Sequence, residues 1–147
     1  MQGSFQQEAP HMPAPSAPQN LGRFELQKPL GRGAQGEVWL ALDPRLQRQV
    51  AIKRLLQRAL DANVLERWLG EARAVGRLSH PNIVPLYEAD LEGVQPFLVF
   101  ELVKGETLAQ HLKKRGALPE AEALKLMQGV LDGLRHAHEA SRPRPPA

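Results

Sequence analysis

The sequence predicts an α+β domain in which a five-stranded antiparallel sheet packs against one helix and two further helices follow. Short alternating or apolar segments bounded by turn residues predict the strands. Between the third and fourth strands, apolar residues recur at steps of three and four from about residue 63 to residue 78, as on one face of a helix. Two more helical patterns run from Thr107 to Arg115 and from Pro119 onward. The expected strands are 24–31, 38–42, 50–53, 85–90 and 95–101.

Composition narrows the function classes. A length of 147 residues fits about one domain, and 42% hydrophobic residues can form a core. The chain has no cysteine, which excludes disulfides, thiolate zinc sites and a cysteine nucleophile. Its net charge of +3 comes from interspersed acidic and basic residues, so we expect a solvated surface and no nucleic-acid binding.

The N-terminal segment, residues 1–22, is rich in proline and glutamine and has little to bury, so we expect a disordered leader. It lacks a charged region followed by an apolar core, and no apolar run of about 18 residues occurs in the chain. These features predict no membrane segment and favour a cytoplasmic protein.

A glycine pattern organises the first half of the domain. Gly31, Gly33, Gly36 and Val38 form G-x-G-x-x-G-x-V, in which glycine lets the main chain approach another group closely. A strand follows these glycines, whereas a dinucleotide-binding turn would lead into a helix. The hairpin is therefore either a tight turn or a cradle for phosphate. Lys53 ends the next strand and favours the cradle, because its ammonium can act as a point charge on phosphate oxygens.

Glu71 is the one carboxylate beside the apolar face of the first helix. It lies between Trp68 and Val75 in the i−3 and i+4 positions, at the edge of the packed face. A carboxylate at a buried edge calls for a partner, and Lys53 is the candidate. The alternative is an ordinary solvent-facing glutamate.

These signals together resemble the first half of a eukaryotic-type (Hanks-type) protein kinase domain of the serine/threonine kind. The stretch His80-Pro81-Asn82-Ile83-Val84 adds to the resemblance, since it starts nine residues after Glu71. The resemblance implies ATP with Mg²⁺ as the nucleotide, a protein as the substrate, and a supporting ion pair between Lys53 and Glu71.

The resemblance also implies the remaining nucleotide contacts. Small apolar residues would cover the adenine, Phe100 would be the gatekeeper, and Glu106 would lie near the ribose. Main-chain groups of Glu101 and Val103 would face the adenine edge. Ordinary core packing remains the alternative for the apolar members. The candidate nucleotide-binding residues are Leu30, Gly31, Gly33, Gly36, Val38, Ala51, Lys53, Phe100, Glu101, Val103 and Glu106.

The resemblance divides the chain into an N-terminal lobe with hinge at 23–103, the first helices of a C-terminal lobe at 104–140, and a proline- and arginine-rich tail at 141–147. No H-R-D, D-F-G or A-P-E triplet occurs in these residues, and we identify no metal ligand. We therefore expect a truncated kinase domain that is not catalytic as it stands, so whether the chain is an enzyme stays open.

A non-catalytic, pseudokinase-like module that binds a nucleotide or a protein partner is the alternative. The last helix bears a wide apolar stripe, from Leu124 to Leu134. Without further chain to cover it, this stripe would face water, and we expect self-association through it.

Overall fold

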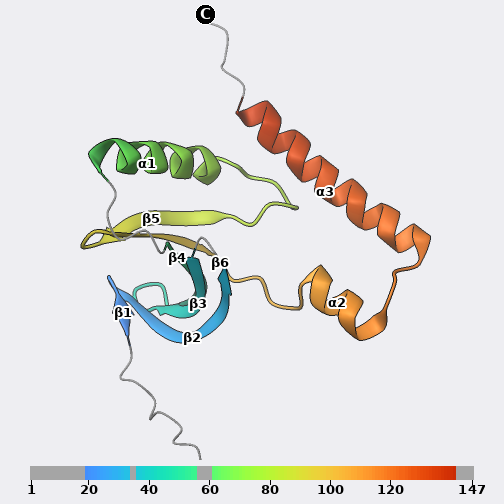
Figure 1. The fold of residues 1–147 in the computed structure, drawn as a ribbon, viewed down its shortest axis with the longest axis horizontal. Helices are drawn as coiled ribbons and strands as arrows, with labels where there is room; N and C mark the ends of the chain where they lie inside the picture. Colours follow the sequence, from blue (N-terminus) through green and yellow to red (C-terminus); the bar gives the residue numbers. More distant parts are fainter. Residues whose placement is uncertain (1–18, 34–35, 56–60, 142–147) are drawn as a thin grey trace, which may run out of the picture.

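The computed structural model describes residues 19–33, 36–55 and 61–141, and Figure 1 shows their fold. Their regular elements are six strands and three helices. In chain order they are β1 (Asn20–Leu21), β2 (Phe24–Gly33), β3 (Gly36–Asp43), β4 (Arg48–Leu55), α1 (Ala62–Gly76), β5 (Leu86–Glu92), β6 (Gln95–Glu101), α2 (Leu108–Arg115) and α3 (Glu120–Ala140).

The six strands form one antiparallel sheet in the order β1-β2-β3-β4-β6-β5. Figure 1 shows α1 lying along β5, with α2 and α3 following the end of β6. The predicted class is therefore confirmed: one sheet with one helix against it, followed by two helices.

The predicted number of strands was one too low. Asn20 and Leu21 form the extra strand β1 and pair with Glu25 and Phe24. Gly22, at a φ of 56°, makes the turn between them, and the Leu21 side chain is only 3% exposed. Order therefore starts before residue 23, because a single buried leucine anchors this segment. The rest of the predicted leader, residues 1–18, lies outside the described residues, as does most of the predicted tail.

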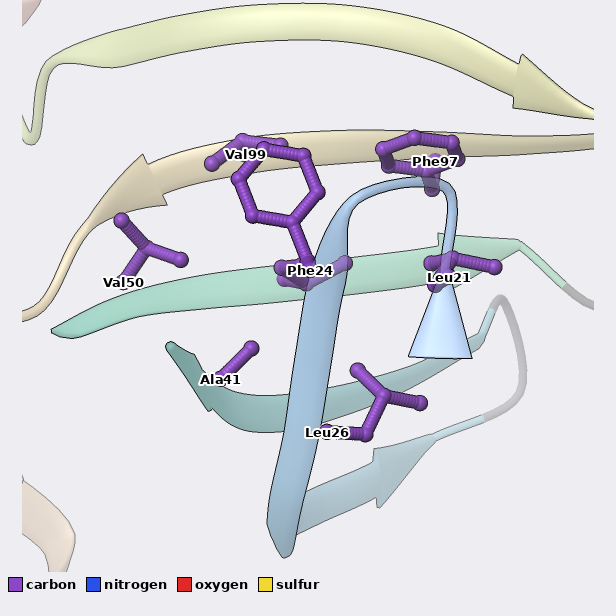
Figure 2. Close-up of a cluster of buried hydrophobic side chains, with 8 residues drawn as sticks. Leu21, Phe24, Leu26, Ala41, Val50, Phe97 and Val99 are labelled. Carbon is purple, nitrogen blue, oxygen red and sulfur yellow. The ribbon is translucent and has the colours of Figure 1, made fainter. Parts of the chain in front are cut away.

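The hydrophobic core lies on one face of the curled sheet. Figure 2 shows Phe24 reaching from β2 toward Val99 and Phe97 on β6. The two phenylalanine rings meet edge to face, with centroids 6.1 Å apart, which is a favoured aromatic geometry. The buried cluster is Leu21, Phe24, Leu26, Ala41, Val50, Ile52, Phe97 and Val99.

An ion network fastens the N-terminal turn across the sheet. Arg23 donates to both carboxylate oxygens of Glu88 on β5, at 3.0 and 2.6 Å, and to Asp43 at the end of β3, at 3.3 Å. Asp43 is buried and also accepts main-chain N–H groups from Arg45 and Leu46. Burial alone would raise the pKa of Asp43, but these hydrogen bonds outweigh it and hold the pKa below its ordinary value.

Side chains at the helix starts explain where two helices begin. The carboxylate of Asp61 accepts the N–H of Val64 at 2.8 Å and caps α1. Thr107 and Gln110 form a reciprocal capping box at the start of α2. Helix α1 ends at Gly76, two residues before the predicted end at residue 78.

Helix α3 meets the loop that follows α1. A Cβ at Gly133 would lie 3.3 Å from the carbonyl oxygen of Asn82, so glycine allows this close approach. On the same contact, the imidazole rings of His80 and His136 lie 5.2 Å apart. The predicted stripe of α3 is open to solvent, with the following residues 47 to 60% exposed: Leu124, Leu126, Met127, Val130, Leu131 and Leu134. Within the described residues, no helix is both long enough and apolar enough to cross a membrane.

Candidate nucleotide-binding site

Strand register places four of the predicted residues on one face of the sheet. Val38 on β3 lies opposite Lys53 on β4, and Ala51 lies opposite Phe100 on β6. Directly paired residues of antiparallel strands share a face, as do residues two apart on one strand. These four side chains are therefore neighbours on the face opposite the core residue Ile52, and all four are half-buried.

The glycines of the hairpin have different surroundings. Among the described residues, no protein atom lies within 4 Å of a Cβ at Gly31 or Gly33, so the described part of the fold leaves open space beside both. A Cβ at Gly36 would overlap the carbonyl oxygen of Arg54, so strand packing alone requires glycine there. The hairpin tip, residues 34–35, lies outside the described residues. Space for a ligand is thus found at the first two glycines.

The expected Lys53–Glu71 ion pair is not formed in this structure. Neither side chain belongs to any ion pair among the described residues. Helix α1 turns Leu69, Ala72 and Gly76 toward β5. Glu71 lies about 100° around the helix from Ala72 and is exposed. The orientation of the helix leaves the Glu71 carboxylate in solvent.

The segment after β6 offers main-chain groups. Val103 is 63% exposed, and its N–H donates to no main-chain carbonyl within the described residues. Glu101, at the end of β6, is exposed, and its own N–H is bound to the carbonyl of Pro85 at 3.1 Å. Leu30, on β2, is 47% exposed. Each of these residues is accessible to a ligand, and within the described part of the chain Val103 has a free donor.

Glu106 has protein partners of its own. Its carboxylate accepts from Lys114 at 2.6 Å and lies 3.0 Å from Nδ1 of His111, both on α2. The hydrogen bonds to Lys114 and then to His111 lower the pKa of Glu106. It lines a hollow of about 690 Å³ between α2 and α3, together with Leu126 and Val130. The four residues of the sheet face do not line this hollow, so the structure does not bring Glu106 together with them.

Sequence reasoning missed a polar cluster on the core face behind the hairpin. Glu37 on β3 bonds to the indole of Trp39 and pairs with Arg54 on β4. The signal was present in the alternation of β3, because Glu37 and Trp39 are two residues apart and must share a face.

Comparison with known proteins identifies the family to which the chain belongs. Residues 24–141 match the protein kinase domain family. The chain belongs to this family. The match begins at the first residue of β2 and runs through α3, so it includes the hairpin, Lys53 and both helices after the sheet.

Among curated relatives, this chain is 40% identical over 129 residues to the probable serine/threonine-protein kinase PknB of Bifidobacterium longum. It is 36% identical over 119 residues to the serine/threonine-protein kinase PrkC of Bacillus subtilis and 40% identical over 119 residues to PknL of Mycobacterium tuberculosis. Each alignment covers 80% of this chain, but only 18%, 18% and 30% of the respective relatives.

Solved structures of the Mycobacterium tuberculosis PknI kinase domain share the fold. One superposes with a TM-score of 0.73 at 27% identity and covers 87% of this chain and 53% of that domain. A double mutant of the same domain gives a TM-score of 0.77 and covers 87% and 54%. The chain therefore spans about half of these kinase domains.

Proposed function

We propose that this chain is the nucleotide-binding half of a serine/threonine protein kinase domain. The shared face of Val38, Ala51, Lys53 and Phe100 supports the proposal most strongly, because it places one ammonium beside an apolar surface. Apolar side chains with a few convergent polar groups are typical of ligand sites. In this proposal the apolar side chains contact adenine and Lys53 contacts phosphate.

The hairpin supports the phosphate assignment independently. Gly31 and Gly33 leave space that a Cβ would fill, and Lys53 has no competing ion pair among the described residues. Phosphate groups fit such a cradle, since main-chain N–H groups and an ammonium both favour negative charge. Val103 would donate its N–H to the adenine edge.

Magnesium is a different matter. The described residues hold no group of three histidine, aspartate or glutamate side chains that could bind a metal ion. We therefore assign metal ions to none of the described residues. Phosphoryl transfer also needs a carboxylate that accepts the proton of the substrate hydroxyl, and residues 1–147 contain no H-R-D triplet. In our proposal these residues alone bind nucleotide weakly and do not transfer phosphate to a protein substrate.

Titration of the purified chain with Mg-ATP tests this function. Saturation-transfer NMR suits the measurement because it detects weak ligands at low protein concentration. We expect Lys53→Ala to weaken binding about tenfold, the effect of losing one hydrogen bond to a charged group. Lys113→Ala, which removes an exposed lysine on α2, is the matched control. Equal affinity in the two variants would contradict the phosphate role of Lys53.

A second candidate function is binding of a protein partner through α3. Six large apolar side chains on this helix are about half exposed. Monomeric proteins rarely expose a contiguous apolar patch of this kind unless it forms an interface. We propose a second copy of the chain as the occupant.

A further inference from the structure

The polar cluster around Glu37 lies behind the glycine hairpin. Glu37 directly follows Gly36, and its strand register places it between Arg32 on β2 and Arg54 on β4. One carboxylate oxygen accepts the Nε1–H of Trp39 at 2.9 Å and lies 3.5 Å from Nη2 of Arg54. The indole hydrogen bond, together with the charges of Arg54 and Arg32, lowers the pKa of Glu37 despite partial burial. The carboxylate is therefore ionised at neutral pH. It connects β3 to β4 through its ion pair with Arg54.

This cluster connects the hairpin to the core. Glu37 and Trp39 point away from the face of Val38, because side chains alternate along a strand. Trp39 packs against the buried cluster of the sheet, and the Arg54 guanidinium lies 6.0 Å from the centre of its ring. We call Glu37, Trp39 and Arg54 the rear clamp. It holds β3 from the side opposite the proposed nucleotide.

The two strands of the hairpin are fastened unequally. On β3, the rear clamp adds to the tight main-chain packing of Gly36 on Arg54. On β2, Gly31 and its two following residues are exposed, and the register with β3 shifts twice, between Leu26 and Lys28 and between Pro29 and Gly31. Near the glycines, the β3 side of the hairpin is thus fixed to the core, whereas the β2 side, residues 31–33, is held mainly by its pairing with β3.

We propose that Glu37 is a positioning residue for phosphate binding by a nucleoside triphosphate, because the rear clamp fixes the β3 side of the glycine hairpin to the core. This inference rests on the proposed nucleotide-binding function. Glu37 touches no nucleotide itself and acts through the main chain of Gly36, the last glycine of the hairpin. Main-chain donors bind an anion well only when the protein holds them in place beforehand, since ordering them on binding lowers affinity.

The position of the rear clamp behind the hairpin predicts different effects on ATP and on adenosine. Releasing the rear clamp should weaken ATP, whose phosphates contact the hairpin, and should leave adenosine unchanged, since adenosine has no phosphate. A role in general stability would weaken both ligands alike. Glu37→Ala removes the bonds of the carboxylate to both Trp39 and Arg54, whereas Glu37→Gln keeps an oxygen acceptor for Trp39 and loses only the charge.

The experiment compares the affinities of ATP and adenosine for the wild-type chain, Glu37→Ala, Glu37→Gln and the control Glu25→Ala. Glu25 is an exposed glutamate of the same sheet, on β2. A Trp68→Phe background leaves Trp39 as the single tryptophan of the chain, so its fluorescence reports release of the clamp directly. Far-UV circular dichroism checks that each variant is folded.

We expect Glu37→Ala to weaken ATP binding about tenfold, with adenosine affinity unchanged. Glu37→Gln should lie between Glu37→Ala and wild type, and Glu25→Ala should match wild type. Equal losses for ATP and adenosine, or no loss for ATP while Trp39 fluorescence shows an open clamp, would overturn the inference alone. Wild-type protein that binds neither ligand would overturn the proposed function, and this inference with it. If Glu37→Ala does not fold, the ATP-to-adenosine contrast in Glu37→Gln decides.

Discussion

Single residues of the glycine hairpin have separate physical reasons for being glycine. Gly36 is required by the fold, because its α-carbon lies against the main chain of β4. Gly31 is not required by any contact within 4 Å from the described residues. Sequence alone shows one pattern of three glycines, whereas the structure separates a packing glycine from one that leaves room for a ligand.

We predict that Gly36→Ala lowers the free energy of unfolding by about 2 kcal/mol, since the new methyl group must push β3 away from β4. Gly31→Ala should change it by less than about 0.5 kcal/mol, as is usual for exposed sites. Urea unfolding followed by circular dichroism measures both values. Similar losses in the two variants would show that the strand packing at Gly36 is less tight than described.

Asp43 makes the stability of the fold depend on pH, so that stability falls at low pH. Its pKa in the folded state lies below the ordinary value of 3.8, because hydrogen bonds from Arg23 and two main-chain N–H groups outweigh the effect of burial. The contribution of ionised Asp43 to stability is therefore complete above pH 3.8 and is lost as the pH falls through the folded-state pKa.

We predict that Asp43→Asn lowers the free energy of unfolding at pH 7 by about 2 kcal/mol, because it leaves charged Arg23 without one buried acceptor. The difference between wild type and variant should shrink as the pH is lowered below about 4. Urea unfolding at several pH values measures it, with Asp132→Asn, in an exposed pair on α3, as the control. A difference that stays constant down to about pH 2 would contradict the assignment.

At the scale of elements, α3 carries a wide apolar stripe that is about half exposed in the described structure. Its contact with the rest of the chain runs through Asn82 and His80, on the side of Gly133 and His136. The apolar stripe lies outside that contact, since its six side chains are about half exposed. The helical period predicted this stripe correctly, and only the structure shows which side the preceding loop covers.

We predict that the chain self-associates through α3 and that Leu131→Glu shifts it toward monomer, because a charge in an apolar interface is unfavourable. Light scattering coupled to size-exclusion chromatography over a dilution series measures the state. Gln128→Glu introduces the same charge outside the stripe and should leave the association unchanged. A wild-type chain that stays monomeric at the highest concentration would rule out this use of the stripe.

At the scale of the whole molecule, much of the fold could be predicted from sequence, because strand alternation and helical period reflect burial directly. The positions of Val38, Ala51 and Lys53 on one face follow from alternation and register. Leu21 could not be predicted, since a single apolar residue has no period. Whether Lys53 and Glu71 pair depends on the orientation of α1, which local sequence does not determine.

At the same scale, the residues present limit the transfer of phosphate. We predict no Lys53-dependent transfer of labelled phosphate from Mg-ATP to a generic protein substrate by the 147 residues alone, because they hold no H-R-D or D-F-G group. Incorporation that disappears in Lys53→Ala would show that another carboxylate of this chain accepts the proton.

The central claim is that one face of the sheet and the open side of the hairpin bind a nucleotide together. Chemical-shift mapping of the ¹⁵N-labelled chain with Mg-ATP tests it most directly. We expect the largest shifts at the amides of Gly31, Gly33, Lys53 and Val103, and small shifts along α3. Shifts concentrated around the hollow between α2 and α3, with the hairpin unaffected, would contradict the account.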